Sequence, residues 1–195
     1  MSCAILLPAA GASSRMGGRD KLLEIVDGQP LLVRQALRAL ATGAPVYVTT
    51  RQDRPARIAA LDALNVTQVH VADPDHGLSA SLRAGVSALP ANVTDLMVLL
   101  PDLPDVETAD LRAMIAAQIS APGKIQRATA QDGTPGHPTI FPRKFFADLT
   151  TLTGDTGAQA LLSREGFTPF PLLGNRAITD LDTPEDWARW RAARD

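Results

Sequence analysis

The sequence predicts an α/β fold in which a mostly parallel β-sheet is covered by helices on both faces. Short apolar segments rich in Val, Leu and Ile alternate with segments of helical periodicity through the first part of the chain. This alternation is typical of parallel sheets, in which a helix usually connects one strand to the next. The length of 195 residues fits one domain with a substantial core, because single cores stop growing only beyond about 250 residues.

The expected elements follow one another regularly. Pro30 marks one helix start and the acidic Asp105 and Glu107 mark another, because proline and acidic residues favour the first turn of a helix. The expected strands are residues 3–7, 45–50, 66–71 and 95–100, and the expected helices are residues 30–41, 54–65, 78–89 and 106–119.

The pattern changes after about residue 120. Residues 124–141, KIQRATAQDGTPGHPTIF, predict two extended pieces around Gly and Pro turns. Short helices follow, and TPEDWARWRAA predicts a final helix over residues 183–193. Neither an internal repeat nor a low-complexity linker interrupts the sequence. We therefore expect a single domain over residues 1–195, in which residues 121–195 lie over the crevice of residues 1–120.

Charge and cysteine content exclude several classes of protein. The formal net charge of −2 provides no basic surface for nucleic acid or for a membrane. Cys3 is the only cysteine, which excludes an internal disulfide and fits a reducing compartment, and its distance from His70 and His76 does not match a zinc site. No apolar run approaches the roughly 20 residues of a membrane span. We expect a cytoplasmic protein with no nucleic-acid or membrane partner.

The loop after the first expected strand, PAAGASSRMGGRDK, carries the first functional signal. Gly11 and Gly17 allow backbone amides to turn toward a ligand, and clustered amides form an anion-binding concavity. Arg15 adds a planar fork and Lys21 a point charge. The spacing matches neither the P-loop nor the dinucleotide-binding pattern. The loop predicts a phosphate site at the carboxyl edge of the sheet, and a flexible surface loop is the alternative interpretation.

Acidic residues form the second signal. Asp102 follows the apolar strand 95–100, and Asp180 and Asp182 alternate along an extended piece, so these two share one face. Carboxylate oxygens suit a magnesium ion that carries nucleotide phosphates. Structural alternatives remain open, because Asp102 could start a turn or cap a helix, and Asp182 or Thr183 could cap the last helix.

Taken together, these segments resemble a family of nucleotidyltransferases related to the molybdenum cofactor cytidylyltransferases. PAAGASSRMGGRDKLL is similar to the family signature L-A-A-G-x-S-x-R-M-G-x-x-x-K-L-L. Pro8, Pro101 and Leu103 depart from the family pattern without removing a charged group. Further similar segments follow in order, namely HGLSASLRAG (76–85), LLPDLPDV (99–106), GHPTIFPRKFF (136–146), GDTGAQALL (154–162) and TDLDTPEDW (179–187).

The resemblance implies a nucleotide-diphospho-sugar transferase fold, a three-layer α/β/α sandwich with a Rossmann-like, GT-A-like sheet. It implies a magnesium-dependent enzyme that transfers a nucleotide to a phosphorylated acceptor and releases pyrophosphate. Residues 1–120 would bind the nucleoside triphosphate and residues 121–195 the acceptor. Residues 9–11 resemble the cytidylyl branch, which implies CTP as donor, a molybdopterin-type acceptor, and a molybdoenzyme or its chaperone as protein partner.

The resemblance also implies roles for individual residues. Arg15, Lys21 and Asp102 would be catalytic, and Asp102 and Asp182 would hold Mg²⁺ with Asp180 as a third acid. The acceptor would contact Gly136, His137 and Pro138. The nucleotide would contact Ala9, Ala10, Gly11, Ala12, Ser13, Ser14, Arg15, Met16, Gly17, Lys21, Ser79 and Ser81.

Purely structural roles remain open for several of these residues. Ser79 and Ser81 also fit a helix start whose core face is Leu78, Leu82 and Val86. His137 also fits a structural imidazole, and the paired aromatic residues Phe145, Phe146, Trp187 and Trp190 fit packing.

Other functions also remain open. These are a GTP-dependent guanylyltransferase, a nucleotidyltransferase acting on another phosphorylated acceptor such as a sugar phosphate, and a non-catalytic nucleotide-binding chaperone or sensor.

Overall fold

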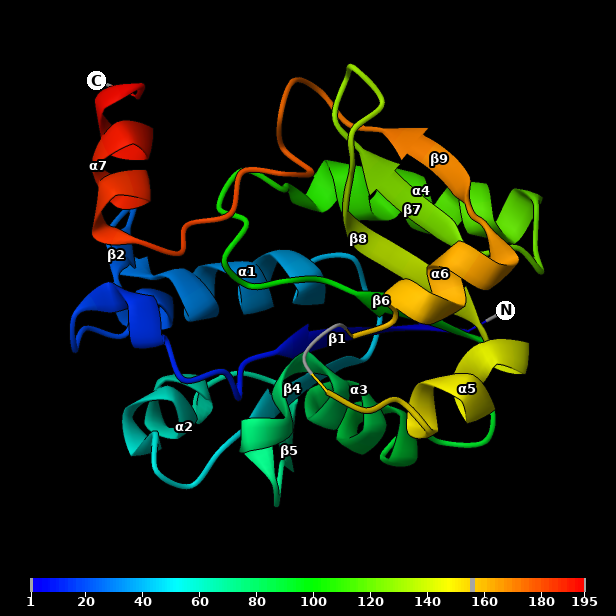
Figure 1. The fold of residues 1–195 in the computed structure, drawn as a ribbon, viewed down its shortest axis with the longest axis horizontal. Helices are drawn as coiled ribbons and strands as arrows, with labels where there is room; N and C mark the ends of the chain where they lie inside the picture. The colour runs from blue at the N-terminus through cyan, green and yellow to red at the C-terminus, as the bar shows by residue number, and fades with distance from the viewer. Residues whose placement is uncertain (1, 155–156, 195) are drawn as a thin grey trace.

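The structure, a computed structural model, describes residues 2–154 and 157–194, and contains the predicted sheet (Figure 1). The seven strands lie in the order β5-β4-β1-β6-β8-β7-β9, and β8 alone among them runs antiparallel to its neighbours. The predicted α/β class is therefore confirmed. The strands are β1 (Cys3–Pro8), β4 (Val46–Thr50), β5 (Thr67–His70), β6 (Asp95–Val98), β7 (Gln126–Thr129), β8 (Pro135–Pro142) and β9 (Thr168–Pro171).

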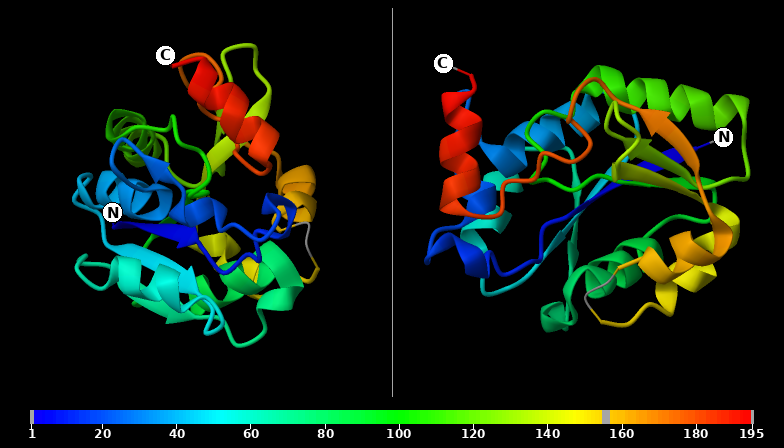
Figure 2. Two further views of the ribbon diagram at one scale, coloured as in Figure 1. Left: turned by 90° about the vertical axis from the view of Figure 1, so that its left-hand side faces the viewer. Right: turned by 45° about the horizontal axis from the view of Figure 1, so that its top comes forward.

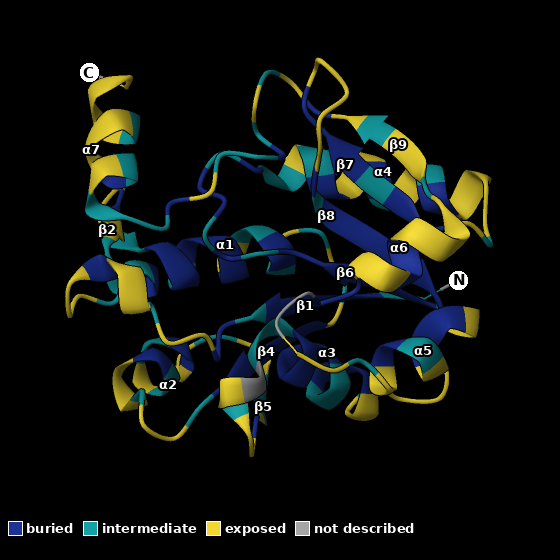
Figure 3. Ribbon diagram, viewed as in Figure 1, coloured by how far each residue is buried: buried dark blue, intermediate teal, exposed yellow. Residues whose placement is uncertain are grey.

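Helices cover both faces of this sheet. Ile5 and Leu7 of β1 belong to the core under α1, α2 and α4, whereas Leu6 belongs to the core under α3, α5 and α6. Successive side chains of a strand point to opposite faces, so one short strand serves both cores. Figure 3 shows the sheet as a mainly buried layer. The helices are α1 (Leu31–Leu40), α2 (Pro55–Leu61), α3 (Gly77–Ser87), α4 (Thr108–Ser120), α5 (Phe146–Thr150) and α6 (Gln159–Glu165).

Some elements differ from the prediction. The edge strand β9 was not expected, because Pro169 and Pro171 lack the N–H group that a strand needs except on the outer side of a sheet edge, where no neighbouring strand accepts it. A ribbon of two two-residue strands, β2 and β3, is too short to show periodicity. The remaining short elements are η1 (Ser14–Met16), η2 (Lys21–Leu23), β2 (Ile25–Val26), β3 (Gln29–Pro30), η3 (Pro74–His76) and η4 (Arg143–Phe145).

The strand register places three chain segments at one edge of the sheet. Leu6 pairs with Val98, so β1 and β6 end together and their following loops leave at the same edge. Thr139 of the antiparallel β8 lies opposite Val98, so the start of β8 reaches this edge as well. Open parallel sheets bind ligands at this edge.

The last helix, α7 (Pro184–Ala192), stands at the same edge beside β2 and the segment that leads into it, as Figure 1 and the right-hand view of Figure 2 show. Trp187 is only 1% exposed and packs with Met16, Val26 and Leu181. This contact ties the loop after β1 to residues near the end of the chain.

Two further observations concern the whole chain. Across the described ranges, every helix is too short or too polar to cross a lipid bilayer. Residues 155 and 156, inside the predicted GDTGAQALL segment, lie outside the described residues, as do residues 1 and 195.

Candidate active site

A cavity of about 310 Å³ opens at the carboxyl edge of the sheet. It joins the loop after β1, the turn after β6, the start of α3 and the segment before α7, all of which the sequence singled out. Its lining residues are Pro8, Gly11, Arg15, Lys21, Leu22, Arg57, Gly77, Leu78, Ser81, Leu100, Pro101, Asp102, Asp180 and Asp182.

Lys21 lies between two carboxylates at the centre of the cavity. Its Nζ atom is 2.5 Å from Asp102 Oδ2 and 2.6 Å from Asp182 Oδ1. The exposed Arg15 reaches the same acid from the other side, with Nη2 2.8 Å from Asp182 Oδ2. Burial alone would lower the pKa of Lys21, but the charge of Asp102 and hydrogen bonds to both carboxylates raise it. Lys21 is therefore a cation at neutral pH.

Local structure explains how these groups meet. Asp20 caps η2 by accepting a hydrogen bond from Leu22 N–H at 3.1 Å, which sets the direction of the intervening Lys21. The backbone N–H of Leu181 donates to the Asp102 carbonyl at 3.1 Å and joins the two acid-bearing segments.

Helix α1 braces the turn that carries Asp102. Arg34 donates to the Pro104 carbonyl at 2.6 Å, and Arg38 donates to the carbonyls of Pro104 and Val106 at 2.7 and 2.6 Å. These arginines carry no signal in the sequence, because an amphipathic helix commonly places arginine on its flank.

The structural alternatives are realised in part, because Asp102 lies in a turn and Thr183 caps α7, but neither acid caps a helix. Helix α4 is capped by Glu107 in a reciprocal box with Asp110, and α7 is capped by Thr183 in a box with Asp186. Asp102 lies in a turn and Asp182 lies just before a cap, but the side chains of both face Lys21.

The acids fit a divalent cation that is shared with a substrate. Asp102 Oδ1 is buried and has no hydrogen-bond partner in the part of the chain that the structure describes, and Asp180 lines the same cavity. Burial raises the pKa of Asp180, and the charges of Asp102 and Asp182 add to this rise. Within residues 2–154 and 157–194, no three His, Cys, Asp or Glu side chains are arranged to hold a metal. This donor set suits Mg²⁺, which binds one or two carboxylates and completes its shell with phosphates and water.

The loop after β1 offers backbone donors to an anion. The N–H groups of residues 10–13 hydrogen-bond to no other described residue. Ser13 has a φ of 55° and Gly17 a φ of 60°, so the loop turns through two left-handed residues. The side chains of Ala9, Ala10 and Met16 are buried, which leaves their backbone as the part that can contact a nucleotide.

Arg57 of α2 is a functional candidate that the sequence reasoning missed. Its side chain is 1% exposed and donates to the carbonyls of Ala9 and Gly11 at 2.6 and 2.7 Å. It also donates to Ser13 Oγ and forms a two-pronged ion pair with Asp20. The only sequence signal is the spacing of Arg51, Arg54 and Arg57, which does not distinguish a buried arginine from a solvated one.

The two serines of α3 take different positions. Ser81 lines the cavity, whereas Ser79 is fully buried, does not line it, and has an Oγ atom without a partner among the described residues. Leu82 and Val86 lie in the core, as the periodicity predicts.

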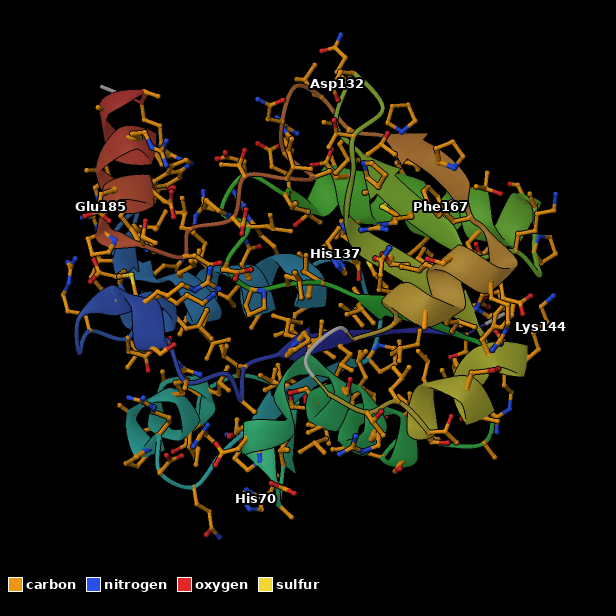
Figure 4. All side chains as sticks on the ribbon, viewed as in Figure 1. His70, Asp132, His137, Lys144, Phe167 and Glu185 are labelled. Carbon is orange, nitrogen blue, oxygen red and sulfur yellow. The ribbon has the colours of Figure 1, made fainter. Side chains whose placement is uncertain are left out.

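Gly136, His137 and Pro138 lie at the start of β8 and do not line the cavity. A Cβ atom on Gly136 would lie 1.9 Å from the Ala177 carbonyl oxygen, so glycine permits a close backbone approach here. His137 lies near the centre of the molecule (Figure 4). Its imidazole hydrogen-bonds to the Val98 carbonyl, and its Nδ1 atom is buried with no partner in residues 2–154 and 157–194.

The environment of His137 keeps its imidazole neutral. Burial, followed by the charge of Arg127, lowers the pKa of His137 to about 4, against the effect of the Val98 carbonyl.

The paired aromatic residues have packing roles. On α7, Trp187 and Trp190 meet edge to face at 6.0 Å, and Trp190 Nε1–H donates to Asp105 at 3.0 Å. Phe145 and Phe146 are likewise buried in the core.

Comparison with protein families gives a match over most of the chain. The family described as "MobA-like NTP transferase domain" matches residues 4–168. A probable molybdenum cofactor guanylyltransferase of Natronomonas pharaonis is 38% identical and aligns over 95% of each chain. A molybdenum cofactor guanylyltransferase of Cereibacter sphaeroides is 28% identical over 94% of this chain and 93% of its own.

Solved structures show the same architecture. The protein Rv0371c of Mycobacterium tuberculosis superimposes with a TM-score of 0.85 at 27% identity, over 97% of both chains. A complex of that protein with manganese gives a TM-score of 0.74 at 26% identity over 96% of both chains. A CMP:2-keto-3-deoxy-manno-octonic acid synthetase complexed with CTP, only 16% identical, gives a TM-score of 0.79 over 100% of this chain and 98% of its own. The implied nucleotide-diphospho-sugar transferase fold is thereby confirmed.

Proposed function

This chain belongs to the family of MobA-like NTP transferase domains, and on that premise we propose that it transfers a nucleotide from a nucleoside triphosphate to molybdopterin. The observation that carries the proposal is the placement of Lys21 between Asp102 and Asp182, in the same cavity as a loop whose amides at residues 10–13 hydrogen-bond to no other described residue. The names of the curated relatives support molybdopterin as the acceptor. A molybdoenzyme or its chaperone would receive the product.

The proposed reaction needs no side-chain base. An oxygen of the terminal acceptor phosphate attacks the α-phosphorus of the nucleotide, and the bond from that phosphorus to the bridging oxygen of the β-phosphate breaks. Pyrophosphate leaves with the bridging oxygen, and a phosphoanhydride joins nucleotide to acceptor. A phosphate monoester with a second pKa near 6 is already largely ionised at neutral pH, so the attacking oxygen has no proton to lose.

The residues of this chain would act by binding and alignment. The amides of residues 10–13 and the guanidinium of Arg15 would bind the β- and γ-phosphates, and Lys21 would add a positive charge. Asp102 and Asp182 would hold Mg²⁺, and Asp180 is proposed as a third acid beside them. The metal would neutralise charge on the phosphates. The manganese complex of Rv0371c supports a divalent cation at this type of site.

The two halves of the chain are proposed to divide the substrates. Residues 1–120 would bind the nucleotide, with Ser81 of α3, which lines the cavity, beside the base or ribose. Residues 121–195 would bind the acceptor, with Gly136, His137 and Pro138 closest to it. The position of His137 near Asp102, whose charge affects its pKa, supports this arrangement.

We propose CTP as the donor because residues 9–11 resemble the cytidylyl branch. Ala10 is buried, and it packs against Val71 and Ala80, so its methyl group fills space that a glycine would leave open. GTP is the second candidate, because the curated relatives are named guanylyltransferases.

A screen of labelled triphosphates tests both the reaction and the base. The protein is incubated with Mg²⁺, molybdopterin and each nucleoside triphosphate in turn, and pyrophosphate release and dinucleotide formation are measured. CTP-dependent product supports the proposal, and a preference for GTP overturns the base assignment. Product with a sugar phosphate but not with molybdopterin overturns the acceptor.

Asp102→Asn separates catalysis from binding. We expect pyrophosphate release to fall by about a thousandfold or more while nucleotide affinity changes only severalfold, because the change removes a carboxylate that would hold the metal beside the reacting phosphate. Asp132→Asn, in the exposed turn before β8, is the matched control and should keep full activity. Release by neither the unmodified protein nor any variant, with nucleotide binding intact, would favour a non-catalytic sensor.

A further inference from the structure

Three arginines hold the carbonyl side of the phosphate loop. Arg57 donates to the carbonyls of Ala9 and Gly11 at 2.6 and 2.7 Å. Arg54 donates to the carbonyl of residue 12 at 2.7 Å, and Arg51 reaches that of residue 10 at 3.4 Å. Four consecutive carbonyls, those of residues 9–12, are therefore bound by side chains from one short segment.

The spacing of these arginines explains how one segment can do this. The backbone N–H of Arg57 donates to the Arg54 carbonyl, and that of Arg54 to the Arg51 carbonyl, so the three residues lie on successive turns at the start of α2. Side chains three residues apart lie on one side of such turns. The guanidinium groups therefore face the loop together.

The planar peptide bond links the direction of each carbonyl to that of the N–H group of the next residue. In a trans peptide the C=O of one residue and the N–H of the next point in opposite directions. When the arginines hold the carbonyls of residues 9–12, the N–H groups of residues 10–13 turn away from the arginines. These are the N–H groups that hydrogen-bond to no other described residue.

Two of these arginines are paired with carboxylates, so their positive charges are balanced while their other N–H groups hold the loop. Arg57 is paired with Asp20 through two contacts of 2.7 and 2.8 Å, and Arg51 is paired with Asp53. Asp20 in turn caps the short helix that begins with Lys21. Through Asp20, Arg57 therefore connects the phosphate loop to Lys21, the residue that binds both carboxylates of the site.

We propose that Arg57, supported by Arg54 and Arg51, is a positioning residue that holds the phosphate loop in its anion-binding form before the ligand arrives. The ligand class is a polyphosphate chain. The assignment of that chain to a nucleoside triphosphate rests on the proposed function, but the affinity of the loop for polyphosphate does not. Arg57 has no role in the chemical step, because its donors are occupied by the loop itself.

Inorganic tripolyphosphate, which carries neither base nor acceptor, is the probe for this proposal. Its dissociation constant is measured by calorimetry with Mg²⁺ for the unmodified protein and for Arg57→Lys. Lysine keeps the charge opposite Asp20 but loses the planar fork, so it can hold at most part of the loop. We expect the dissociation constant to rise by about tenfold or more, as for loss of charge-assisted hydrogen bonds.

Kinetics distinguish positioning from general damage to the fold. In Arg57→Lys the KM for the nucleoside triphosphate should rise by a similar factor, while kcat and the KM for the acceptor stay within about twofold, because binding is lost equally in the ground state and the transition state. Arg143→Lys is the matched control. Arg143 also holds a carbonyl, that of Val93 at 2.7 Å, at the opposite edge of the sheet, and its replacement should leave tripolyphosphate binding unchanged.

Two further variants keep the proposal testable if Arg57→Lys does not fold. Arg54→Ala removes the donor to residue 12 from a half-buried site, and Asp20→Asn removes the charge that orients Arg57. Each should weaken tripolyphosphate binding by about threefold or more. The proposal is overturned if a folded Arg57→Lys binds tripolyphosphate as the unmodified protein does, or if both other variants do. Tight tripolyphosphate binding without nucleotide turnover would overturn the proposed function alone.

Discussion

Lys21 occupies the position between two carboxylates that a divalent cation would share. Its ammonium group is within 2.6 Å of oxygens from both Asp102 and Asp182. Without this cation the two acids would face each other in a partly buried cavity, which costs free energy. The lysine therefore stabilises the site in the absence of metal, and a metal that binds both acids must displace it.

Lys21→Met tests this competition between the lysine and the metal. We expect the variant to have a lower Tm than the unmodified protein, and Mg²⁺ or Mn²⁺ to raise its Tm by about 2 °C or more beyond the rise in the unmodified protein. Thermal melts monitored by fluorescence, with and without metal, provide the measurement. Lys144→Met, on the exposed face of η4, is the control. Equal metal-induced shifts in all three proteins would contradict the interpretation.

His137 makes stability depend on pH in a defined window. Its pKa is about 4 in the folded protein and 6.5 as the reference value, so between these values the unfolded chain binds more protons. The stabilisation by neutral His137 is complete above about pH 6.5 and is lost as the pH falls toward 4. The shift corresponds to about 3 kcal/mol.

Urea unfolding between pH 7 and pH 4 checks this expectation. The free energy of unfolding should fall more steeply in the unmodified protein than in His137→Gln, which cannot titrate at this site. His70→Gln, at an exposed position, should keep the steep dependence. A slope in His137→Gln equal to that of the unmodified protein would refute the assignment.

The sequence indicates a candidate site residue where a charged side chain lies beside an apolar segment. Lys21, Asp102 and Asp182 could be predicted because each follows or precedes an apolar segment and because a family signature joins them. Arg57 could not be predicted, since its role depends on burial against loop carbonyls that lie far away in sequence. Gly136 was predicted to contact the acceptor, and the structure shows a packing reason for the glycine that the resemblance does not contain.

At the level of elements, β8 meets the segment before α7 through Gly136. A Cβ atom there would lie 1.9 Å from a backbone oxygen of Ala177, and that contact cannot relax by a side-chain rotation. Gly136→Ala should lower the free energy of unfolding by about 3 kcal/mol or more, in the range of overpacked core sites. It should also impair activity, because residues 180–182 follow directly.

Gly11→Ala provides the opposite case for the same measurement. A Cβ atom on Gly11 meets nothing within 4 Å and the backbone needs no positive φ, so stability should stay within about 0.5 kcal/mol. Because Gly11 lines the cavity, its methyl group should weaken tripolyphosphate binding. Chemical denaturation and calorimetry of both variants check the pair, and a normal stability for Gly136→Ala would exclude the close contact.

Periodicity predicted the long elements and missed those that tertiary contacts create. The strands β1, β4, β5 and β6 and the helices α1 to α4 agree with the expected ranges to within a few residues, except that α2 ends at Leu61 rather than near 65. The strand β9 forms because β7 offers it a free edge, and not because TPFP favours a strand. The ribbon formed by β2 and β3 packs against α7, a contact that periodicity does not predict.

At the level of the whole molecule, we expect residues 1–195 to unfold as one cooperative unit. The core on one face of the sheet contains residues from β1 and from the segment at 172–177, so neither half has a core of its own. Circular dichroism reports on the helices, and tryptophan fluorescence reports on α7 alone, which holds both tryptophans. The two probes should give coincident urea transitions, and separate midpoints would show that the halves are independent domains.

The contact between Met16 and Trp187 also constrains the order of events during synthesis. The loop leaves the ribosome well before Asp182 and Trp187, because Asp182 lies 161 residues beyond Lys21 in the chain. A nascent chain therefore displays the loop without its cover and without one of its two acids. The full set of contacts around Lys21 can therefore form only after residue 182 has been synthesised.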